Sequence, residues 1–266
     1  MKNDTPWVMF ALVSGIAIIA LLFYRSGSKP EEAPVSIPVQ VETPPAPPPM
    51  EPEPEFYPVP VAEPEAELPP PPSLDESDGP FAELLGKILG PETLSDFFLT
   101  DTLIRRIVTT VDNLPREKVA VRLWPVLPTA GKFMTTGEDD ALEVNPENAR
   151  RYQPFVELMA AADTRGLVLL YIHYYPLFQQ AYQELGYPDG HFHTRLVQVI
   201  GHLLEVPDPA GPLKLVRPSV YFKFADAQLE SLSFGQKALL RIGSENRAIL
   251  RGKLTELRLA LAAKGP

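Results

Sequence analysis

The sequence predicts a mainly α protein with a single N-terminal transmembrane helix, a disordered linker rich in proline and glutamate, and a C-terminal helical domain with a minor β hairpin or extended arm. Three observations predict it. Residues 7–24 carry no charge, residues 30–79 hold 17 of the 32 prolines, and glycines and prolines divide the remainder into segments of helical length. A chain of 266 residues is long enough to bury a core in one or two domains.

The uncharged segment, residues 7–24, follows a short tail of residues 1–6. A helix of this length, at about 1.5 Å per residue, spans roughly 27 Å, which is close to the hydrocarbon thickness of a bilayer. Trp7 and Tyr24 stand at its ends, where aromatic rings favour the membrane interface. A cleaved signal peptide is the alternative, but the apolar run is longer than a usual signal core and no small-residue cleavage site precedes Arg25. We expect a retained membrane anchor.

The charges beside this segment are nearly balanced, with Lys2 on one side and Arg25 and Lys29 on the other. Large following domains cross the membrane largely regardless of such charges, and a long spacer suits a domain that works away from the membrane. We therefore expect the C-terminal domain on the outer side. Ala11 and Gly15 have the small-x-x-x-small spacing that lets membrane helices pack closely, so a homo-oligomer is a further hypothesis.

The predicted linker, residues 25–79, is defined by composition. Its main part, residues 30–79, contains twelve acidic residues and no basic one. Proline cannot donate a backbone hydrogen bond and like charges repel, so this tract is predicted to be extended and without a packed core. A spacer is the preferred interpretation, and docking of its Pro-x-x-Pro pieces in a partner's aromatic groove is the alternative.

The predicted domain, residues 80–266, has 21 basic and 21 acidic residues, although the whole chain has a net charge of −10. Glycine, proline and capping residues mark its helices: Pro80 starts the first, Thr100 can cap the third, Asn145-Pro146 precedes the fourth, and Ser233 with Gln236 forms a capping box. The expected segments are 80–89, 92–99, 100–114, 147–163, 167–185 with a kink or break at Pro176, 194–206, 236–242, and a last helix capped by Ser244.

Periodicity indicates which faces are buried. Leu103, Ile107, Thr110 and Leu114 share one face of their helix. Leu250, Leu254, Leu257 and Leu261 form a stripe on the last helix. Two regions favour β or extended structure: a possible hairpin from 132–135 to 142–144, and the alternating segment 213–224, which Pro218 restricts to an edge strand or an arm.

Five blocks of the domain, 103–116, 151–163, 174–192, 203–226 and 233–250, resemble in order and wording a bacterial domain-of-unknown-function family, numbered 3014. The resemblance covers essentially residues 74–262. It implies a single-pass protein of the bacterial inner membrane with a proline-rich linker and, with the orientation expected above, a periplasmic domain. It provides no catalytic residues.

Two groups of side chains resemble metal sites in composition but not in spacing. His191, His193 and His202 with Glu205 suggest a metal, but His193 and His202 lie on opposite faces of one helix. The acidic loop Glu138, Asp139, Asp140 and Glu143 lacks the spacing of a Ca²⁺ loop. We therefore expect no metal and no cofactor. No nucleophile or phosphate-binding motif is present, and the absence of cysteine excludes thiol chemistry.

Two patterns remain as binding surfaces. Tyr171, Tyr175, Phe178 and Tyr182 form an aromatic stripe that could stack on sugar rings, although such stripes more often belong to the core. The last two helices are basic and could meet an anionic polymer or another envelope protein; a solvated face is the simpler alternative. The candidate partner-binding residues are Lys237, Arg241, Arg247, Arg251, Lys253 and Arg258.

These observations favour a non-enzymatic envelope protein whose helical domain binds or scaffolds a partner at a distance from the membrane. The alternative is a cell-wall hydrolase with the Tyr-rich helix and a carboxylate such as Glu157 or Asp163 in a cleft. Nucleic acid is not an expected partner, since the domain has no net positive charge and is predicted to lie in the envelope.

Overall fold

The structure is a computed structural model that describes residues 56–60, 69–117, 121–138, 141–218 and 221–263. The predicted transmembrane segment 7–24 and most of the linker lie outside these ranges. Within them, no helix combines the length and apolarity needed to cross a membrane.

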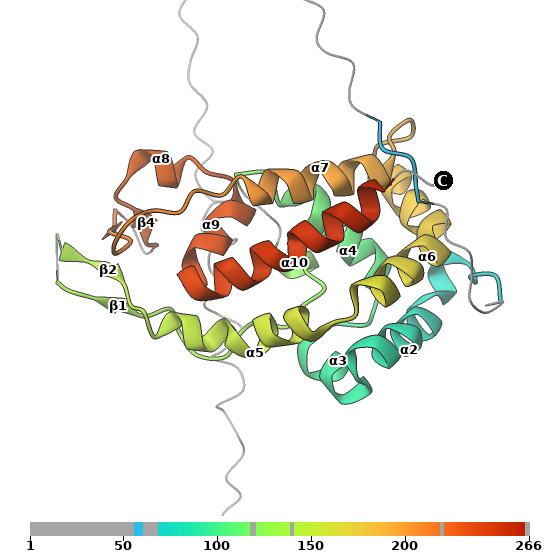
Figure 1. The fold of residues 1–266 in the computed structure, drawn as a ribbon, viewed down its shortest axis with the longest axis horizontal. Coiled ribbons are helices and arrows are strands. Elements are labelled where there is room, and N and C mark those ends of the chain that lie inside the picture. Colours follow the sequence, from blue (N-terminus) through green and yellow to red (C-terminus); the bar gives the residue numbers. More distant parts are fainter. Residues whose placement is uncertain (1–55, 61–68, 118–120, 139–140, 219–220, 264–266) are drawn as a thin grey trace, which may run out of the picture.

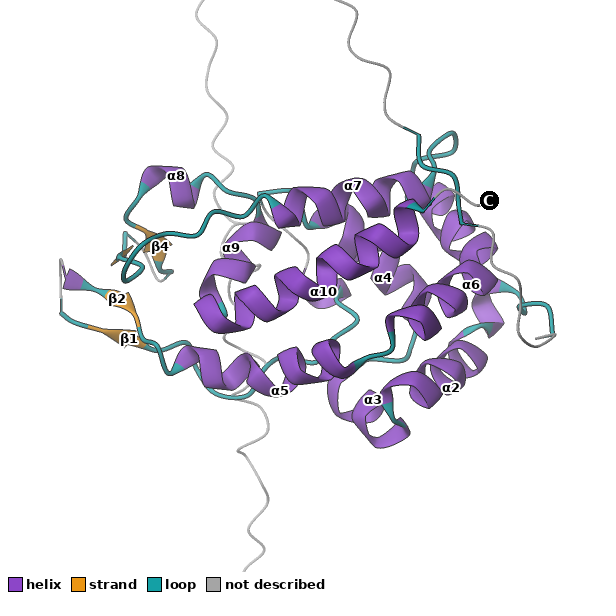
Figure 2. Ribbon diagram, in the orientation of Figure 1, coloured by secondary structure: helices purple, strands orange, loops and turns teal. Residues whose placement is uncertain are grey.

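The described chain is mainly helical, as the sequence predicts, with short strands (Figure 2). Its helices are α2 (Asp78–Leu89), α3 (Pro91–Phe97), α4 (Leu103–Asn113), α5 (Asn148–Ala161), α6 (Thr164–Glu184), α7 (Phe192–Leu204), α8 (Ala227–Glu230), α9 (Phe234–Arg241) and α10 (Ser244–Ala262), with the 3₁₀ turns η3 (Leu74–Glu76) and η4 (Val121–Leu123). The strands are β1 (Thr135–Thr136), β2 (Glu143–Val144), β3 (Leu215–Val216) and β4 (Lys223–Phe224).

Helix α10 runs across the middle of the domain and packs against α5, α6 and α7 (Figure 1). Behind it, α4 lies against α6 and α7, while α2 and α3 form the opposite end of the molecule from the strands. The predicted leucine stripe explains this position, because Leu261 is fully buried and Leu250, Leu254 and Leu257 are partly buried. The last helix therefore joins elements from most of the domain.

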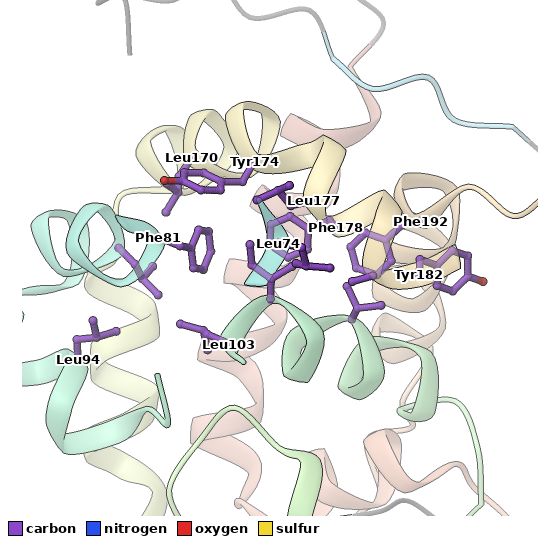
Figure 3. Close-up of a cluster of buried hydrophobic side chains, with 14 residues drawn as sticks. Leu74, Phe81, Leu94, Leu103, Leu170, Tyr174, Leu177, Phe178, Tyr182 and Phe192 are labelled. Carbon is purple, nitrogen blue, oxygen red and sulfur yellow. The ribbon is translucent and has the colours of Figure 1, made fainter. Parts of the chain in front are cut away.

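The largest hydrophobic cluster is formed by η3, α2, α3, α4, α6 and the start of α7. Figure 3 shows Phe81 facing Tyr174 and Phe178, with Leu74 and Leu103 beside them. The Phe81 ring is edge-on to Tyr174, at 5.0 Å between ring centroids. Since Leu74 is 4% exposed and belongs to this cluster, the folded domain includes residues before the boundary expected at residue 80.

Two antiparallel hairpins form the other end of the domain. In the first, Thr135 of β1 pairs with Val144 of β2, which confirms the predicted hairpin at a shorter length. In the second, Leu215 of β3 pairs with Phe224 of β4, so the segment predicted as one edge strand or arm folds back on itself around Pro218. A bridge between Glu143 and Lys214 joins the hairpins over a small core with Val206 and Leu240.

Several helix ends differ from the prediction by a few residues. Helix α2 begins at Asp78, before Pro80, and α10 begins at Ser244 after Gly243, whose φ of 92° places it in the left-handed region. The N-cap of α4 is Thr102 and not Thr100. Helix α6 continues through Pro176, so the proline does not split it. The capping box of Ser233 and Gln236 is confirmed at the start of α9.

The buried face of α4 also differs from the prediction. Leu103 is buried as expected, but Ile104, Val108 and Asp112 complete the buried face, while Ile107 is only partly buried. Burial of Asp112 was not predicted from the periodicity, because acidic residues are rarely buried unless they are paired. Its partners come from other elements and are described below.

Candidate functional site

The six basic residues proposed from the sequence do not form one exposed surface. Lys237 and Lys253 have largely buried side chains with internal partners. The ammonium of Lys237 donates to the backbone oxygen of Glu230 at 2.9 Å, and that of Lys253 donates to the backbone oxygen of Ala162 and to Thr164 Oγ1, both at 2.9 Å. These two lysines hold α9 and α10 to neighbouring elements.

Arg241 and Arg258 occupy different environments. The guanidinium of Arg241 lies over the ring of Phe224, 5.2 Å from its centroid, and its burial lowers the pKa of Arg241. Arg258 is exposed and lies beside Gly201 of α7, where an added Cβ would be 3.5 Å from its guanidinium nitrogens. Only Arg258 of this pair is available on the surface.

Arg247 and Arg251, one turn apart on α10, border an open depression of about 380 Å³. Arg247 is only 4% exposed and pairs with Asp208, whose carboxylate is itself exposed. Small or short side chains form the rest of the depression, which leaves the α10 surface accessible between the arginines. Its lining residues are Asp208, Ser244, Arg247, Ala248, Arg251, Gly252 and Thr255.

The two arginines differ in charge balance. Asp208 neutralises Arg247, whereas Arg251 donates through Nη2 to the backbone oxygen of Val206 at 2.5 Å and forms no ion pair with a described residue. The Nε of Arg251 is one of two buried side-chain nitrogen or oxygen atoms without a hydrogen-bond partner in the described part of the chain; the other is Thr110 Oγ1. The positive end of the α10 dipole lies at Ser244 beside the same depression. The depression therefore favours a negatively charged group.

A second charged cluster, centred on Asp112, lies in the interior. Its carboxylate, with a side chain only 2% exposed, pairs with Arg116 one turn later and with Arg195 of α7, where Nε is 3.2 Å from Oδ1. Arg195 also donates through Nη2 to the backbone oxygen of Asp112 at 2.9 Å. The Tyr187 hydroxyl donates to Asp112 Oδ2 at 3.2 Å. Two cations and a hydroxyl thus surround one buried carboxylate.

This cluster connects three elements. Tyr187 follows α6 and stacks on Tyr182 at 4.6 Å between ring centroids, while Arg195 belongs to α7 and Asp112 to α4. The segment after α4 is also tied to α9, because the backbone oxygen of Arg116 accepts from Phe234 N–H at 2.8 Å. Proximity to Asp112 raises the pKa of Arg116. The geometry is that of a structural ion cluster with one half-exposed cation, Arg116.

Residues 103–258 match the model of a family described as "Protein of unknown function (DUF3014)". The chain belongs to this family. The match spans more than half of the chain and includes the Asp112 cluster and the α10 depression, so both lie within the DUF3014 region. No curated protein and no solved structure shows a significant match to the chain.

Within the DUF3014 region, the three histidines that suggested a metal site have separate partners. His193 is fully buried, with Nδ1 3.1 Å from the Tyr171 hydroxyl and Nε2 3.1 Å from the backbone oxygen of Leu261. His202 Nε2 lies 2.9 Å from Ser233 Oγ, and the His191 ring contacts Phe56. Among the described residues, no three acidic or histidine side chains are grouped so that they could hold a metal.

The two carboxylates of the hydrolase hypothesis also have separate roles. Asp163 caps α6 by accepting hydrogen bonds from the N–H groups of Arg165 and Gly166, both at 3.0 Å. Glu157 is exposed and accepts from the side chain of Gln153. In the acidic loop, Asp139 and Asp140 lie outside the described residues and Glu143 belongs to β2. The structure does not bring Glu157 and Asp163 into hydrogen-bond contact with each other.

The aromatic stripe of α6 faces the core. Phe178 and Tyr182 are buried in the largest hydrophobic cluster, and Tyr171 packs against it. The Tyr175 hydroxyl donates to Gln179 Oε1 at 3.0 Å. Burial raises the pKa of Tyr171, Tyr175 and Tyr182. These rings therefore stabilise the domain, in agreement with the simpler of the two interpretations.

Asp112, Tyr187 and Arg195 were not predicted from the sequence, and Arg251 was not distinguished there from the other basic residues. One signal was present for the first group. Asp112 and Arg116 are one helical turn apart with opposite charges, on a helix whose neighbouring positions are apolar. The partners from α6 and α7 could be recognised only from the tertiary structure.

Proposed function

We propose that the chain is a non-enzymatic binding or scaffolding protein of the bacterial envelope, in which a single-pass anchor in the inner membrane and the proline-rich spacer present the helical domain to a partner in the periplasm. The partner contacts the depression on α10 with a carboxylate or phosphate group. The observation that carries this proposal is Arg251, a cation without an ionic partner among the described residues, beside an open depression.

The shape and chemistry of the depression support a contact with a large partner. It is open rather than enclosed, and Ala248 and Gly252 leave room for an approaching group. Elsewhere on the same helix, outside the lining of the depression, Ile249 is 45% exposed and Leu259 is 70% exposed. Arginine is enriched in protein-binding surfaces, which suits a contact centred on Arg251.

The hydrolase alternative has less support. Hydrolysis of the glycosidic bonds of a cell-wall polymer usually needs two carboxyl groups on either side of the scissile bond. Asp112 is the sole buried acidic side chain among the described residues, and two guanidinium groups and a hydroxyl already surround it. Asp163, one of the two carboxylates named in the hydrolase hypothesis, uses both of its oxygens to cap α6.

The proposal is tested by site-specific photo-crosslinking in intact cells. A photoreactive amino acid replaces Ala248 in the depression or, as a control, Arg150 on the exposed face of α5. We expect a discrete crosslinked product from position 248 that is absent from position 150. The product is expected to weaken at least fivefold with Arg251→Gln and to persist with Arg258→Gln, since Arg258 lies outside the depression.

The partner's charge is tested with the purified full chain in detergent and dextran sulfate as a soluble anionic probe. Binding through Arg251 should fall as salt rises, because screening weakens charge pairing. Equal crosslinking by the Arg251→Gln chain and by the unmodified chain, or an equal affinity of both for the probe, would refute a role for the depression.

A further inference from the structure

A short part of the proline-rich tract is bound to the domain on a surface separate from the α10 depression. Residues Phe56–Pro60 lie beside the first turn of α7 and the end of α10 (Figure 1). Phe56 and Tyr57 are the two aromatic residues of the tract 30–79, and a tyrosine followed by Pro-Val-Pro continues the segment. The bound segment has no acidic residue, whereas Glu51, Glu53 and Glu55 precede it and Glu63, Glu65 and Glu67 follow it.

A side chain of α7 bonds to the backbone of Tyr57. Thr194 Oγ1 accepts a hydrogen bond from Tyr57 N–H at 3.2 Å and donates one to the Tyr57 backbone oxygen at 3.4 Å. One hydroxyl therefore bonds to both backbone polar groups of Tyr57, so this part of the contact depends on the peptide backbone and not on the side chain at position 57. Thr194 belongs to α7, 137 residues away along the sequence.

Side chains on both sides of Tyr57 complete the contact. The Phe56 ring lies edge-on to the His191 ring, with centroids 5.1 Å apart. Tyr57 packs against a cluster of Val197 and Ile200 from α7 and Leu261 from α10. Pro60 is buried. Apolar contacts around a bonded backbone are how domains bind proline-rich peptides with aromatic residues.

The surface is itself fixed by buried groups. The backbone oxygen of Leu261 accepts from His193 Nε2, one residue before Thr194, so the end of α10 is held against the first turn of α7. Neither residue of this hydrogen bond belongs to Phe56–Pro60, and Phe56 remains 61% exposed. The segment therefore adds to a surface that the domain already forms, and it contributes few of the domain's own contacts.

We propose that the α7–α10 surface is a recognition site for an extended aromatic–proline peptide, and that the chain's own segment Phe56–Pro60 occupies it in cis. A contact made by hydrogen bonds to one residue and by a few apolar side chains is weak for a free peptide. A short connection to the domain raises the local concentration of the segment to the millimolar range, which is sufficient to fill such a site. This inference is independent of the function proposed for α10.

The cis contact is tested by disulfide formation in the full chain, which has no cysteine of its own. Phe56→Cys is combined with His191→Cys or, as a matched control, with Arg150→Cys on exposed α5. We expect the first pair to close at least tenfold faster, within one chain. Equal rates, or a disulfide formed between two chains, would overturn the proposal.

Recognition by Thr194 is tested in the same background. Thr194→Val should slow closure about fivefold, the effect of losing roughly one net hydrogen bond. Thr255→Val is the matched control, because its hydroxyl bonds to the Arg251 backbone oxygen of its own helix. If both substitutions have the same effect, Thr194 does not hold the segment.

Peptide specificity is tested by competition. A synthetic peptide of residues 52–63 at millimolar concentration should slow closure, whereas the same peptide with serine at both aromatic positions should not. In the unmodified full chain, hydrogen exchange at the Tyr57 amide should be slow and become faster with Thr194→Val. Equal competition by the two peptides, or unprotected exchange at Tyr57, would contradict a recognition site.

Discussion

Asp78 caps a helix other than its own: its Oδ2 accepts a hydrogen bond at 2.6 Å from the N–H of Thr102, the residue before α4. Its Oδ1 accepts from Leu103 N–H at 2.9 Å. Thr102 has a φ of 50°, in the left-handed region that non-glycine residues rarely adopt. The carboxylate at the start of α2 therefore holds both the position and the unusual backbone of the start of α4.

Removal of this cap should destabilise the domain. Asp78→Ala is expected to lower the free energy of unfolding by about 1–2 kcal/mol, the usual cost of losing an N-cap. Asp78→Asn keeps one acceptor oxygen and should lose less. Urea unfolding of the full chain in detergent, followed by circular dichroism, measures both. An Asp78→Ala chain as stable as the unmodified chain would show that the two hydrogen bonds contribute nothing net.

Substitution of the buried Asp112 is expected to lower the free energy of unfolding more than loss of the Asp78 cap does. Asp112→Asn leaves Arg116 and Arg195 without a counter-charge, and we expect a loss of about 3 kcal/mol, at the low end for a buried pair because both arginines reach solvent. The matched control is Asp101→Asn, which removes the charge of an exposed carboxylate paired with Arg106 and should destabilise the domain much less. Similar losses in the two variants would mean that burial of Asp112 has no energetic consequence.

His193 predicts a dependence of stability on pH. Burial lowers the pKa of His193 from its ordinary value of 6.5. As the pH falls below 6.5, the unfolded chain takes up a proton that the folded domain still excludes, so the free energy of unfolding falls until the lower folded pKa is reached. The slope from this group is at most roughly 1.4 kcal/mol per pH unit.

Substitutions at this site separate titration from packing. His193→Gln should reduce the slope between pH 6.5 and the more acidic range. Tyr171→Phe removes the hydrogen bond to Nδ1 but keeps a buried imidazole, so it should lower stability by about 1 kcal/mol and retain the slope. The same slope in His193→Gln as in the unmodified chain would assign the acid sensitivity to other groups.

The basic residues of α10 are expected to differ in how much they contribute to the stability of the domain. Lys253→Met removes the hydrogen bonds to Ala162 and Thr164 at the junction of α5 and α6, and should cost about 1–3 kcal/mol. Arg258→Met changes an exposed residue and should alter stability by less than about 0.5 kcal/mol. Thermal unfolding of the two chains compares them directly, and equal shifts would contradict a structural role for Lys253.

Much of the helical pattern could be predicted because its signals are local. Gly90 and Gly243 have positive φ values and separate consecutive helices, and the Ser233 capping box depends on two residues three positions apart. The sequence predicted a kink or a break at Pro176, whereas α6 continues through this residue. Packing of the residues on both sides of Pro176 stabilises a helix that proline alone disfavours.

The long-range relationships could not be predicted in the same way. Asp78 and Thr102 are 24 residues apart, and Asp112 and Arg195 are 83 residues apart. Nothing in a helical repeat indicates that a carboxylate will be paired across such a distance. For the same reason, the sequence could identify the basic residues of the last helices but could not separate Lys253, which is bonded internally, from Arg251, which borders the depression.

The central position of α10 has a consequence for the order in which the domain forms. Its packing partners α5, α6 and α7 are all synthesised before it. The apolar side chains of α7 that face α10 remain uncovered until α10 has been made. A growing chain that has reached residue 243 therefore still exposes Val197 and Ile200. We therefore expect the packing of α10 against α5, α6 and α7 to be a late step in the formation of the domain, after the end of the chain has been synthesised.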